Sequence, residues 1–149
     1  MEDYLMNILL SMIPVSELRV AIPLGIAKGL NPWAVYITAV LGNLVPVPFL
    51  MLLARNIFDW MRGRSEWMDR LLNRVDWRIQ AKAKKVNRYE RLGLLIFVAI
   101  PLPGTGAWSG ALIASFLDLR IRNAMISIFG GLLIAGLIMT MITLGVVSF

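Results

Sequence analysis

The sequence predicts an all-α integral membrane protein built as an inverted repeat, in which each half has a re-entrant helical hairpin followed by a transmembrane helix. Three observations predict it. The 149 residues are 58% hydrophobic and only 16% charged, against about 25% charged residues in soluble proteins. Two uncharged runs, Leu30–Ala54 and Asn123–Phe149, are long enough to cross a bilayer. A third uncharged run, Leu92–Leu117, is interrupted at its centre.

The interruption favours a re-entrant hairpin over a straight membrane helix in residues 92–117. The centre of this run holds a cluster of helix-breaking residues, Pro101, Pro103, Gly104 and Gly106. Prolines remove amide donors and fix φ, and glycines allow a sharp turn. The arm on each side has about 10 residues, enough for about half of a 30 Å hydrocarbon core. Because irregular backbone at that depth must be covered by protein or line a wet cavity, the break also predicts a site.

Residues 1–30 show the same pattern of two short apolar arms separated by a break, but less clearly. Tyr4–Ser16 is uncharged but too short to span a membrane, and Pro14 interrupts it. Glu17 and Arg19 follow, and Val20–Ala27 is apolar again. We therefore expect a first re-entrant hairpin over these 30 residues.

Each hairpin is followed by an expected transmembrane helix. The first covers residues 31–54, where Pro32 suits the first turn and where Pro46 and Pro48 are expected to kink the second half. The second covers residues 118–149 and follows a short charged stretch.

Residues 55–91 form a basic amphipathic insert between the two halves. They contain 11 of the 15 Lys and Arg residues and five of the nine acids, which accounts for the whole net charge of +6. Apolar residues recur there at three- and four-residue steps, which indicates helix. Two arrangements stay open: a helix in the cytoplasmic interface, and a helical hairpin on a partner subunit. A basic block between apolar runs is typical of a cytoplasmic loop beside anionic lipids, and this placement argues against nucleic acid.

The distribution of charge sets the expected topology in the membrane. Arg120 and Arg122 stay with the basic insert on the cytoplasmic side only if residues 92–117 return to the face they entered. The first hairpin then enters from outside, the second enters from inside, and both termini lie outside. This is the inverted repeat of many secondary transporters, whose binding sites lie near the membrane midplane. The whole chain, residues 1–149, is expected to be one membrane domain.

Two registers relate the halves, and the sequence leaves both open. Val20-Ala-Ile-Pro-Leu24 recurs as Val98-Ala-Ile-Pro-Leu102, an offset of 78 positions. Matching the starts of the spans, Asn31 and Asp118, instead needs an offset of 87.

The candidate substrate- or ion-binding residues come from both hairpins and the first span: Glu17, Arg19, Asn43, Pro101, Pro103, Gly104, Thr105, Gly106, Trp108 and Ser109. Charges at membrane depth cost about 2.5–3.5 kcal/mol each on insertion scales and usually serve function. We expect Glu17 to carry a proton or cation and Arg19 to hold an anionic group. Two residues apart on a helix, they are not expected to pair with each other. The structural alternative is that Ser16 caps a half-helix with Glu17 in its first turn, while Arg19 extends to the outer interface.

Thr105 is expected to be the N-cap of the arm that begins at Ala107. Unpaired amides there suit a phosphate or carboxylate, with Trp108 and Ser109 bordering the same space. The alternative is that the glycines and Ser109 serve close helix packing. For Asn43, mid-span, the two readings are a bond to a hairpin turn and a hydrogen bond that joins helices.

Enzyme chemistry is not expected. The sequence has no Cys and no His, which removes disulfides, thiolate nucleophiles and the commonest metal ligands. No nucleophile–base pair, metal cluster or phosphate-binding loop is recognisable. We therefore expect no catalytic residues, no cofactor and no metal.

Several of these stretches resemble the small multidrug export proteins of bacteria and archaea. They are Ser16-Glu-Leu-Arg-Val-Ala-Ile-Pro-Leu-Gly25, Gly42-Asn43 and Pro101-Leu-Pro-Gly-Thr-Gly-Ala-Trp-Ser-Gly-Ala-Leu-Ile-Ala114. With the basic insert, the resemblance covers nearly the whole chain. The chain is more remotely similar to the DedA superfamily, which implies movement of lipids such as undecaprenyl phosphate. DedA-like members carry arginines in the second hairpin, whereas Val98–Ala114 has no charge here and Arg19 is the comparable cation.

Two functions remain open. The leading one is a small transporter or flippase for an amphipathic substrate, either a lipid-linked phosphate or a lipophilic drug-like compound, coupled to protons through Glu17. Two spans barely enclose a pathway, so we expect a homodimer surrounded by membrane lipids. The alternative is a membrane scaffold that organises lipid or recruits partners through Arg55–Arg91.

Overall fold

The structure is a computed structural model that describes residues 1–13, 16–62, 66–67, 69–70, 73–74, 83–102, 105–117 and 119–149. Within these ranges the secondary structure is helical and contains no strand, so the predicted all-α class is confirmed. The named helices are α1 (Glu2–Met12), α2 (Glu17–Ala27), α3 (Pro32–Leu44), α4 (Pro46–Arg62), α6 (Ala83–Ala99), α7 (Ala107–Phe116) and α8 (Ile121–Val147).

Two helical stretches are long and apolar enough to cross a membrane, Pro32–Met61 and Ile121–Val147. The first combines α3 and α4, which meet at Val45 directly before Pro46, where the sequence predicts a kink. The side-chain oxygen of Asn31 accepts a hydrogen bond from the Trp33 amide at 3.0 Å, which fixes the start of α3. Helix α4 continues without a break from the predicted span, which ends at Ala54, into the predicted basic insert as far as Arg62.

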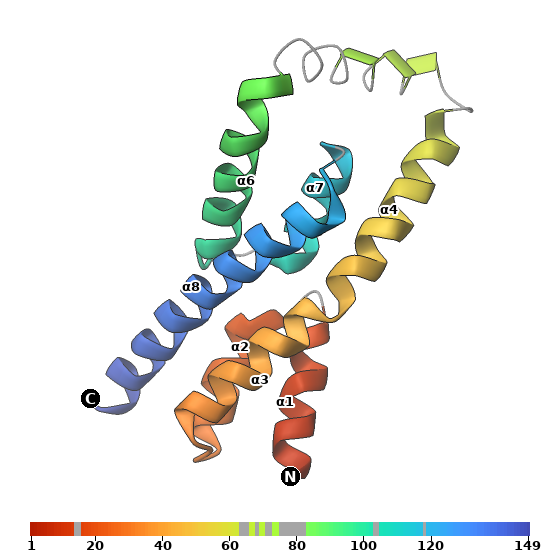
Figure 1. Cartoon of the computed structure of the whole chain (residues 1–149). Helices are drawn as coiled ribbons and strands as arrows, with labels where there is room; N and C mark the ends of the chain where they lie inside the picture. The colour runs from red at the N-terminus through yellow and green to blue at the C-terminus, as the bar shows by residue number, and fades with distance from the viewer. Residues whose placement is uncertain are drawn as a thin grey trace.

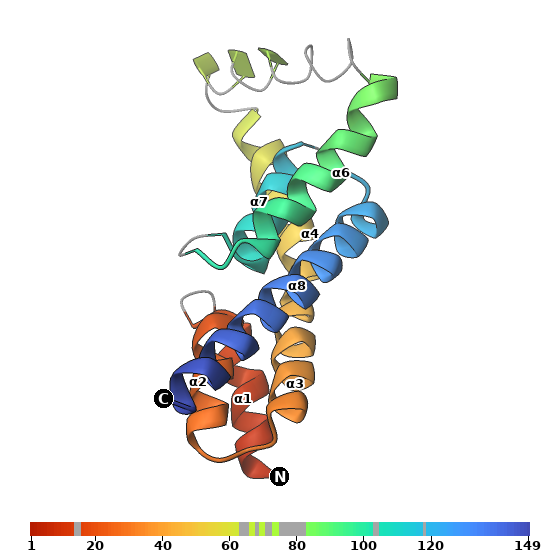
Figure 2. The ribbon, with the colours of Figure 1, turned by 90° about the vertical axis from the view of Figure 1, so that its left-hand side faces the viewer.

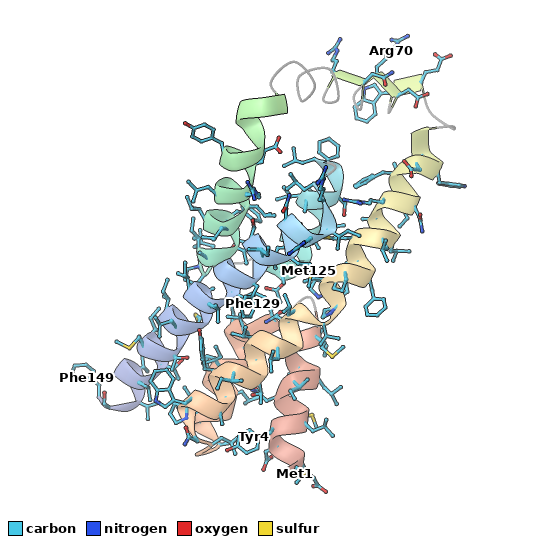
Figure 3. All side chains as sticks on the ribbon, in the orientation of Figure 1. Met1, Tyr4, Arg70, Met125, Phe129 and Phe149 are labelled. Carbon is cyan, nitrogen blue, oxygen red and sulfur yellow. The ribbon has the colours of Figure 1, made fainter. Side chains whose placement is uncertain are left out.

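Two helical hairpins occupy opposite halves of the molecule, α1–α2 below and α6–α7 above, and their tips face each other near the middle (Figures 1 and 2). The α3–α4 helix and α8 run in opposite directions beside both hairpins. Both termini lie at one end of the molecule, with Tyr4 and Phe149, whereas Arg70 lies at the opposite end (Figure 3).

The upper hairpin has unequal arms. Its first arm, α6, begins at Ala83, nine residues before the predicted start at Leu92, and its second arm, α7, has 10 residues. The ends of the predicted basic insert, residues 55–91, therefore belong to α4 and α6. Most of residues 63–82 lie outside the described residues, and with them the middle of the predicted amphipathic helix.

The two hairpins pack in corresponding ways. Helix α1 lies on α3 as α6 lies on α8, while α2 packs against α8 and α7 packs against α4. A Cβ atom added at Gly42 would lie 2.7 Å from the carbonyl oxygen of Ile8, and one added at Gly131 would lie 2.8 Å from that of Leu95. Because neither contact leaves room for a side chain, glycine sets the approach of the first arm to the span in both halves.

These contacts relate the halves by an offset close to 87, not 78. Leu95 follows Ile8 by 87 positions and Gly131 follows Gly42 by 89. The repeated pentapeptide lies in different places, because Val20–Leu24 is inside α2 whereas residues 98–102 end α6 and enter the turn. The two copies of the pentapeptide therefore do not occupy corresponding positions in the two hairpins.

The core lies where α2, α3 and α8 cross, and small residues allow the close approach. Its fully buried side chains include Ala21, Ile22, Val35, Ala39, Ile128 and Leu132. Tyr36 donates its hydroxyl to the carbonyl of Leu133 at 2.9 Å, which joins α3 to α8. Near the other end of the molecule, Arg55 on α4 donates to the carbonyl of Leu119 and so holds the connection between α7 and α8.

Candidate functional site

Glu17 begins α2 in a backbone conformation that is unusual for a residue with a side chain. Its φ is +41°, and the residue is only 6% exposed. The left-handed region costs on the order of 1 kcal/mol or more outside glycine and is retained where the surrounding structure demands it. Here it directs the carboxylate away from the axis of α2 and toward the tip of the other hairpin.

The Glu17 carboxylate pairs with Arg19, contrary to the prediction from their spacing. Nη1 of Arg19 donates to Oε2 of Glu17 at 2.7 Å. The spacing rule assumes that both residues have helical φ, and Glu17 does not, so its side chain reaches the same side as that of Arg19.

Arg19 also donates hydrogen bonds to the second hairpin. Its Nη2 donates to the carbonyl of Ile100 at 3.0 Å and to the hydroxyl of Thr105 at 2.7 Å. Its Nε is buried and has no hydrogen-bond partner in the described part of the chain. The guanidinium therefore bridges the two tips and keeps its Nε donor unpaired.

Thr105 is not the N-cap of α7, contrary to the prediction. Gly106 occupies that position, without a side-chain hydrogen bond. The Thr105 hydroxyl instead lies 2.6 Å from the carbonyl of Ile100 and 2.8 Å from that of Leu102. It closes the turn behind the Arg19 contact, so it supports the carbonyl that Arg19 binds.

Gly106 leaves the space that the Glu17 carboxylate fills. A Cβ atom added there would collide with all three atoms of the carboxylate group. The Glu17 carboxylate therefore requires a glycine at position 106. This is a second reason for the glycine, besides the turn that the sequence predicts there.

Trp108 makes a contact that mirrors that of Arg19. Its indole Nε1 donates to the carbonyl of Met12, the last residue of α1, at 3.1 Å. In each hairpin, a backbone carbonyl at the end of the first arm thus accepts a hydrogen bond from the second arm of the other hairpin. Neither acceptor could be predicted from the sequence, because every residue type has a backbone carbonyl.

Asn43 lies fully buried in α3, beside the tip of the first hairpin. With its amide oriented to suit its neighbours, its nitrogen donates to the carbonyl of Ser11 at 2.9 Å and its oxygen accepts from the amide of Leu18 at 2.7 Å. It therefore satisfies backbone groups on both sides of the break between α1 and α2. Both readings from the sequence, a bond to the turn and a joint between helices, describe this arrangement.

The remaining candidates lie apart from this cluster or outside the described residues. Pro101 lies in the turn, partly exposed, and Ser109 makes no hydrogen bond within the described ranges. Pro103 and Gly104 lie outside the described residues. The structure thus brings together Glu17, Arg19, Thr105, Gly106 and Trp108, with Asn43 supporting the first hairpin.

The arrangement is an ion pair enclosed between two hairpin tips, with hydrogen-bonding groups on both sides. Such a site can exchange a proton, a cation or an anionic group without forming a covalent bond. Among the described residues, no group of three or more His, Cys, Asp or Glu side chains is placed to hold a metal ion.

A family model described as "Putative small multi-drug export protein" matches residues 17–138 of the chain. The matched range begins at Glu17 and includes both sides of the ion-pair site, the basic insert and most of α8. No curated protein matches the chain, and no solved structure does.

Proposed function

Because the chain belongs to the family of small multi-drug export proteins, we propose that it is a small secondary transporter with its substrate site between the tips of two re-entrant hairpins. The observation that carries this proposal is the Glu17–Arg19 ion pair, which lies where the two hairpins meet and whose side chains are only 8% and 16% exposed. Charged side chains inside a membrane protein are costly and usually line a substrate or ion pathway.

The corresponding packing of the two halves supports an inverted repeat. Each hairpin lies against the span that follows it and also against the span of the other half. The close glycine contacts at Gly42 and Gly131 recur at nearly the same offset. In secondary transporters with inverted repeats, discontinuous helices meet at the midplane and form the binding site there.

The proposed orientation follows from charge. The end of the molecule where α4 ends and α6 begins carries Arg70 and borders the basic insert, so we assign it to the cytoplasm. The first hairpin then enters from outside and the second from inside, each returning to the face that it entered. The termini lie outside, and we propose a homodimer in which the partner covers the parts of the hairpins that one chain leaves exposed.

With proton coupling, substrate binding and release at the ion pair alternate as Glu17 gains and loses a proton. When Glu17 takes up a proton, its carboxyl no longer attracts the guanidinium, and Arg19 can turn toward an anionic group of a substrate. When the proton leaves, the pair forms again and the substrate is released. For a cationic substrate the exchange is simpler, because the deprotonated carboxylate of Glu17 binds the cation in place of a proton.

The substrate is proposed to be amphipathic because the site is polar and its surroundings are not. The arms beside the tip have exposed apolar side chains, among them Val20, Leu24 and Leu112. A lipid-linked phosphate and a lipophilic drug-like cation both combine a charged group with an apolar body, and a transport assay distinguishes them.

The test is transport by the purified full-length protein in proteoliposomes under an imposed proton gradient. One assay follows ethidium, a lipophilic cation, and a second follows the transbilayer movement of a fluorescent lipid phosphate. We expect the wild type to move one of the two probes, Glu17→Gln to lose the response to the gradient, and Arg19→Lys to slow transport because lysine cannot bridge two acceptors in the same plane.

Lys28→Gln is the matched control. Lys28 and Asp3 form an ion pair at 3.7 Å whose side chains are 45% and 60% exposed, so its loss is expected to leave transport unchanged. The proposal fails if the wild type moves neither probe, or if Glu17→Gln and Arg19→Lys both transport like the wild type at equal abundance. Charge reversal of the exposed Arg70 addresses the scaffold alternative, because a transporter is expected to tolerate it.

A further inference from the structure

A groove lies between α6 and α8 and shares no lining residue with the ion-pair site. It encloses about 580 Å³ and is lined by Tyr89, Arg91, Leu92, Leu95, Ile126 and Ser127. Ligand sites in proteins usually enclose about 300–1,000 Å³. The groove is therefore large enough for a ligand, and the transport proposal does not use it.

The groove lies at the level where both helices change from basic to apolar. On α6, Arg91 is the last charge before the uncharged run that begins at Leu92. On α8, Arg122 is the last charge before the run that begins at Asn123, and it lies one helical turn before Ile126. Such a change on two adjacent helices is typical of the boundary between lipid headgroups and hydrocarbon.

The charge near the groove is positive. Residues 89–95 and 119–127 contain three arginines, Arg91, Arg120 and Arg122, against one acid, Glu90. Basic side chains at the cytoplasmic surface attract anionic lipid headgroups. Below the arginines the rim of the groove is apolar and open, because Leu92 is 54% exposed and Ile126 is 63% exposed.

Ser127 offers a hydrogen bond inside the groove. It is 4% exposed, and its hydroxyl has no hydrogen-bond partner within the described ranges. The other buried hydroxyls of the described chain each donate to the carbonyl four residues earlier; they belong to Ser11, Ser115, Thr140 and Thr143. Among the described residues, the buried side-chain atoms without a partner are Nε of Arg19 and Nε of Arg55, so the unpaired oxygen of Ser127 is open to the groove, where a ligand can accept its hydrogen bond.

We propose that the groove binds an anionic glycerophospholipid of the surrounding bilayer. An acyl chain lies along Leu92, Leu95 and Ile126, and the phosphate lies near Arg91 and Arg122 at the headgroup level. The hydroxyl of Ser127 donates to an oxygen of the ester or phosphate group. A lipid held there fills the open side of the α6–α8 pair.

The natural absence of Cys allows a direct test with Ser127→Cys in the full-length protein. The purified variant is placed in mixed micelles of detergent with phosphatidylglycerol or phosphatidylcholine, and the rate of maleimide labelling is measured as the lipid fraction rises. We expect phosphatidylglycerol to slow labelling at a lower lipid fraction than phosphatidylcholine does. Adding Arg91→Gln or Arg122→Gln is expected to raise the phosphatidylglycerol fraction that halves the rate by about fivefold each.

Leu144→Cys is the control on the same helix, far from the groove and 39% exposed, and the two lipids are expected to affect its labelling equally. The proposal is overturned if the two lipids protect Ser127→Cys equally, or if the arginine variants leave the protection unchanged. It is also overturned if protection follows protein concentration in place of lipid fraction, because a second copy of the chain would then cover the groove. Protection by ethidium without phosphatidylglycerol would assign the groove to an exported compound.

Discussion

The tips of the two hairpins make the same cross-contact with different side chains. Arg19 donates to the carbonyl of Ile100, and Trp108 donates to the carbonyl of Met12. Trp108 follows Arg19 by 89 positions and Ile100 follows Met12 by 88. The geometry of the junction is therefore shared between the halves, whereas its charge comes from the first half alone.

The starts of the second arms show the same difference. The amide of Leu18, near the start of α2, donates to the side chain of Asn43, whereas Gly106, at the start of α7, lies against the carboxylate of Glu17. The first half thus supplies the amide side chain, the carboxylate and the guanidinium, and the second half supplies Gly106 and Thr105 around them. The two hairpin tips thus hold the Glu17–Arg19 ion pair between them, although both of its charges come from the first tip.

Among the substitutions that test this difference between the two halves, the largest effect on stability is expected at Asn43. Asn43→Leu makes the first half resemble the second, where Leu132 lies 89 positions later in α8. Because the carbonyl of Ser11 and the amide of Leu18 lose their partner, we expect the free energy of unfolding to fall by about 1–3 kcal/mol for each unpaired group. Unfolding in mixed detergent micelles, followed by circular dichroism, measures the change.

Leu132→Met is the matched control, because it keeps the volume and has no polar partner to lose. We expect it to cost less than about 1.5 kcal/mol. Equal stability of the Asn43→Leu and Leu132→Met proteins would show that the amide does not support the first tip.

The close glycine contacts test whether the two halves are packed alike. Gly42→Ala and Gly131→Ala each place a Cβ atom against a backbone carbonyl that cannot move independently of its helix. We expect each to lower the free energy of unfolding by about 1–3 kcal/mol, to a similar extent. The same unfolding titration measures both.

Gly93→Ala and Gly145→Ala are the controls, because a Cβ atom at either position meets nothing within 4 Å. Alanine favours helix over glycine by about 1 kcal/mol, so these two variants are expected to be neutral or stabilising. A large cost at only one of Gly42 and Gly131 would contradict the correspondence of the halves.

The sequence predicted the helical class and the two candidate spans because long uncharged runs have few alternatives to membrane helices. It also placed the breaks, since Pro46 and the turn after Ile100 act through local backbone geometry. It failed on the Glu17–Arg19 contact because the spacing rule assumes helical φ. It left two registers between the halves open, and the repeated pentapeptide of common residues lies in different arms of the two hairpins.

Other contacts of the site could not be predicted from the residue types. The acceptors for Arg19 and Trp108 are backbone carbonyls, so residue type does not mark them. Thr105 was a good N-cap by composition, but its hydroxyl is used within the turn. Which backbone groups lie close across the junction is decided by the packing of helices that are far apart in sequence.

The smallest expected effect concerns a hydrogen bond that only the first half has. Asn7 donates to the hydroxyl of Thr38 at 2.9 Å, whereas the corresponding positions 87 and 89 residues later are Leu94 and Ser127. A double-mutant cycle with Asn7→Leu and Thr38→Val is expected to give a coupling energy of about 0.6 kcal/mol, the average for hydrogen bonds between membrane helices. The cycle with Leu94→Ala and Ser127→Ala is expected to give a smaller value, because Ser127 has no partner in the described protein. Equal coupling in both cycles would mean that the second half also joins its arm to its span through this hydroxyl, and the lipid would then have no free donor in the groove.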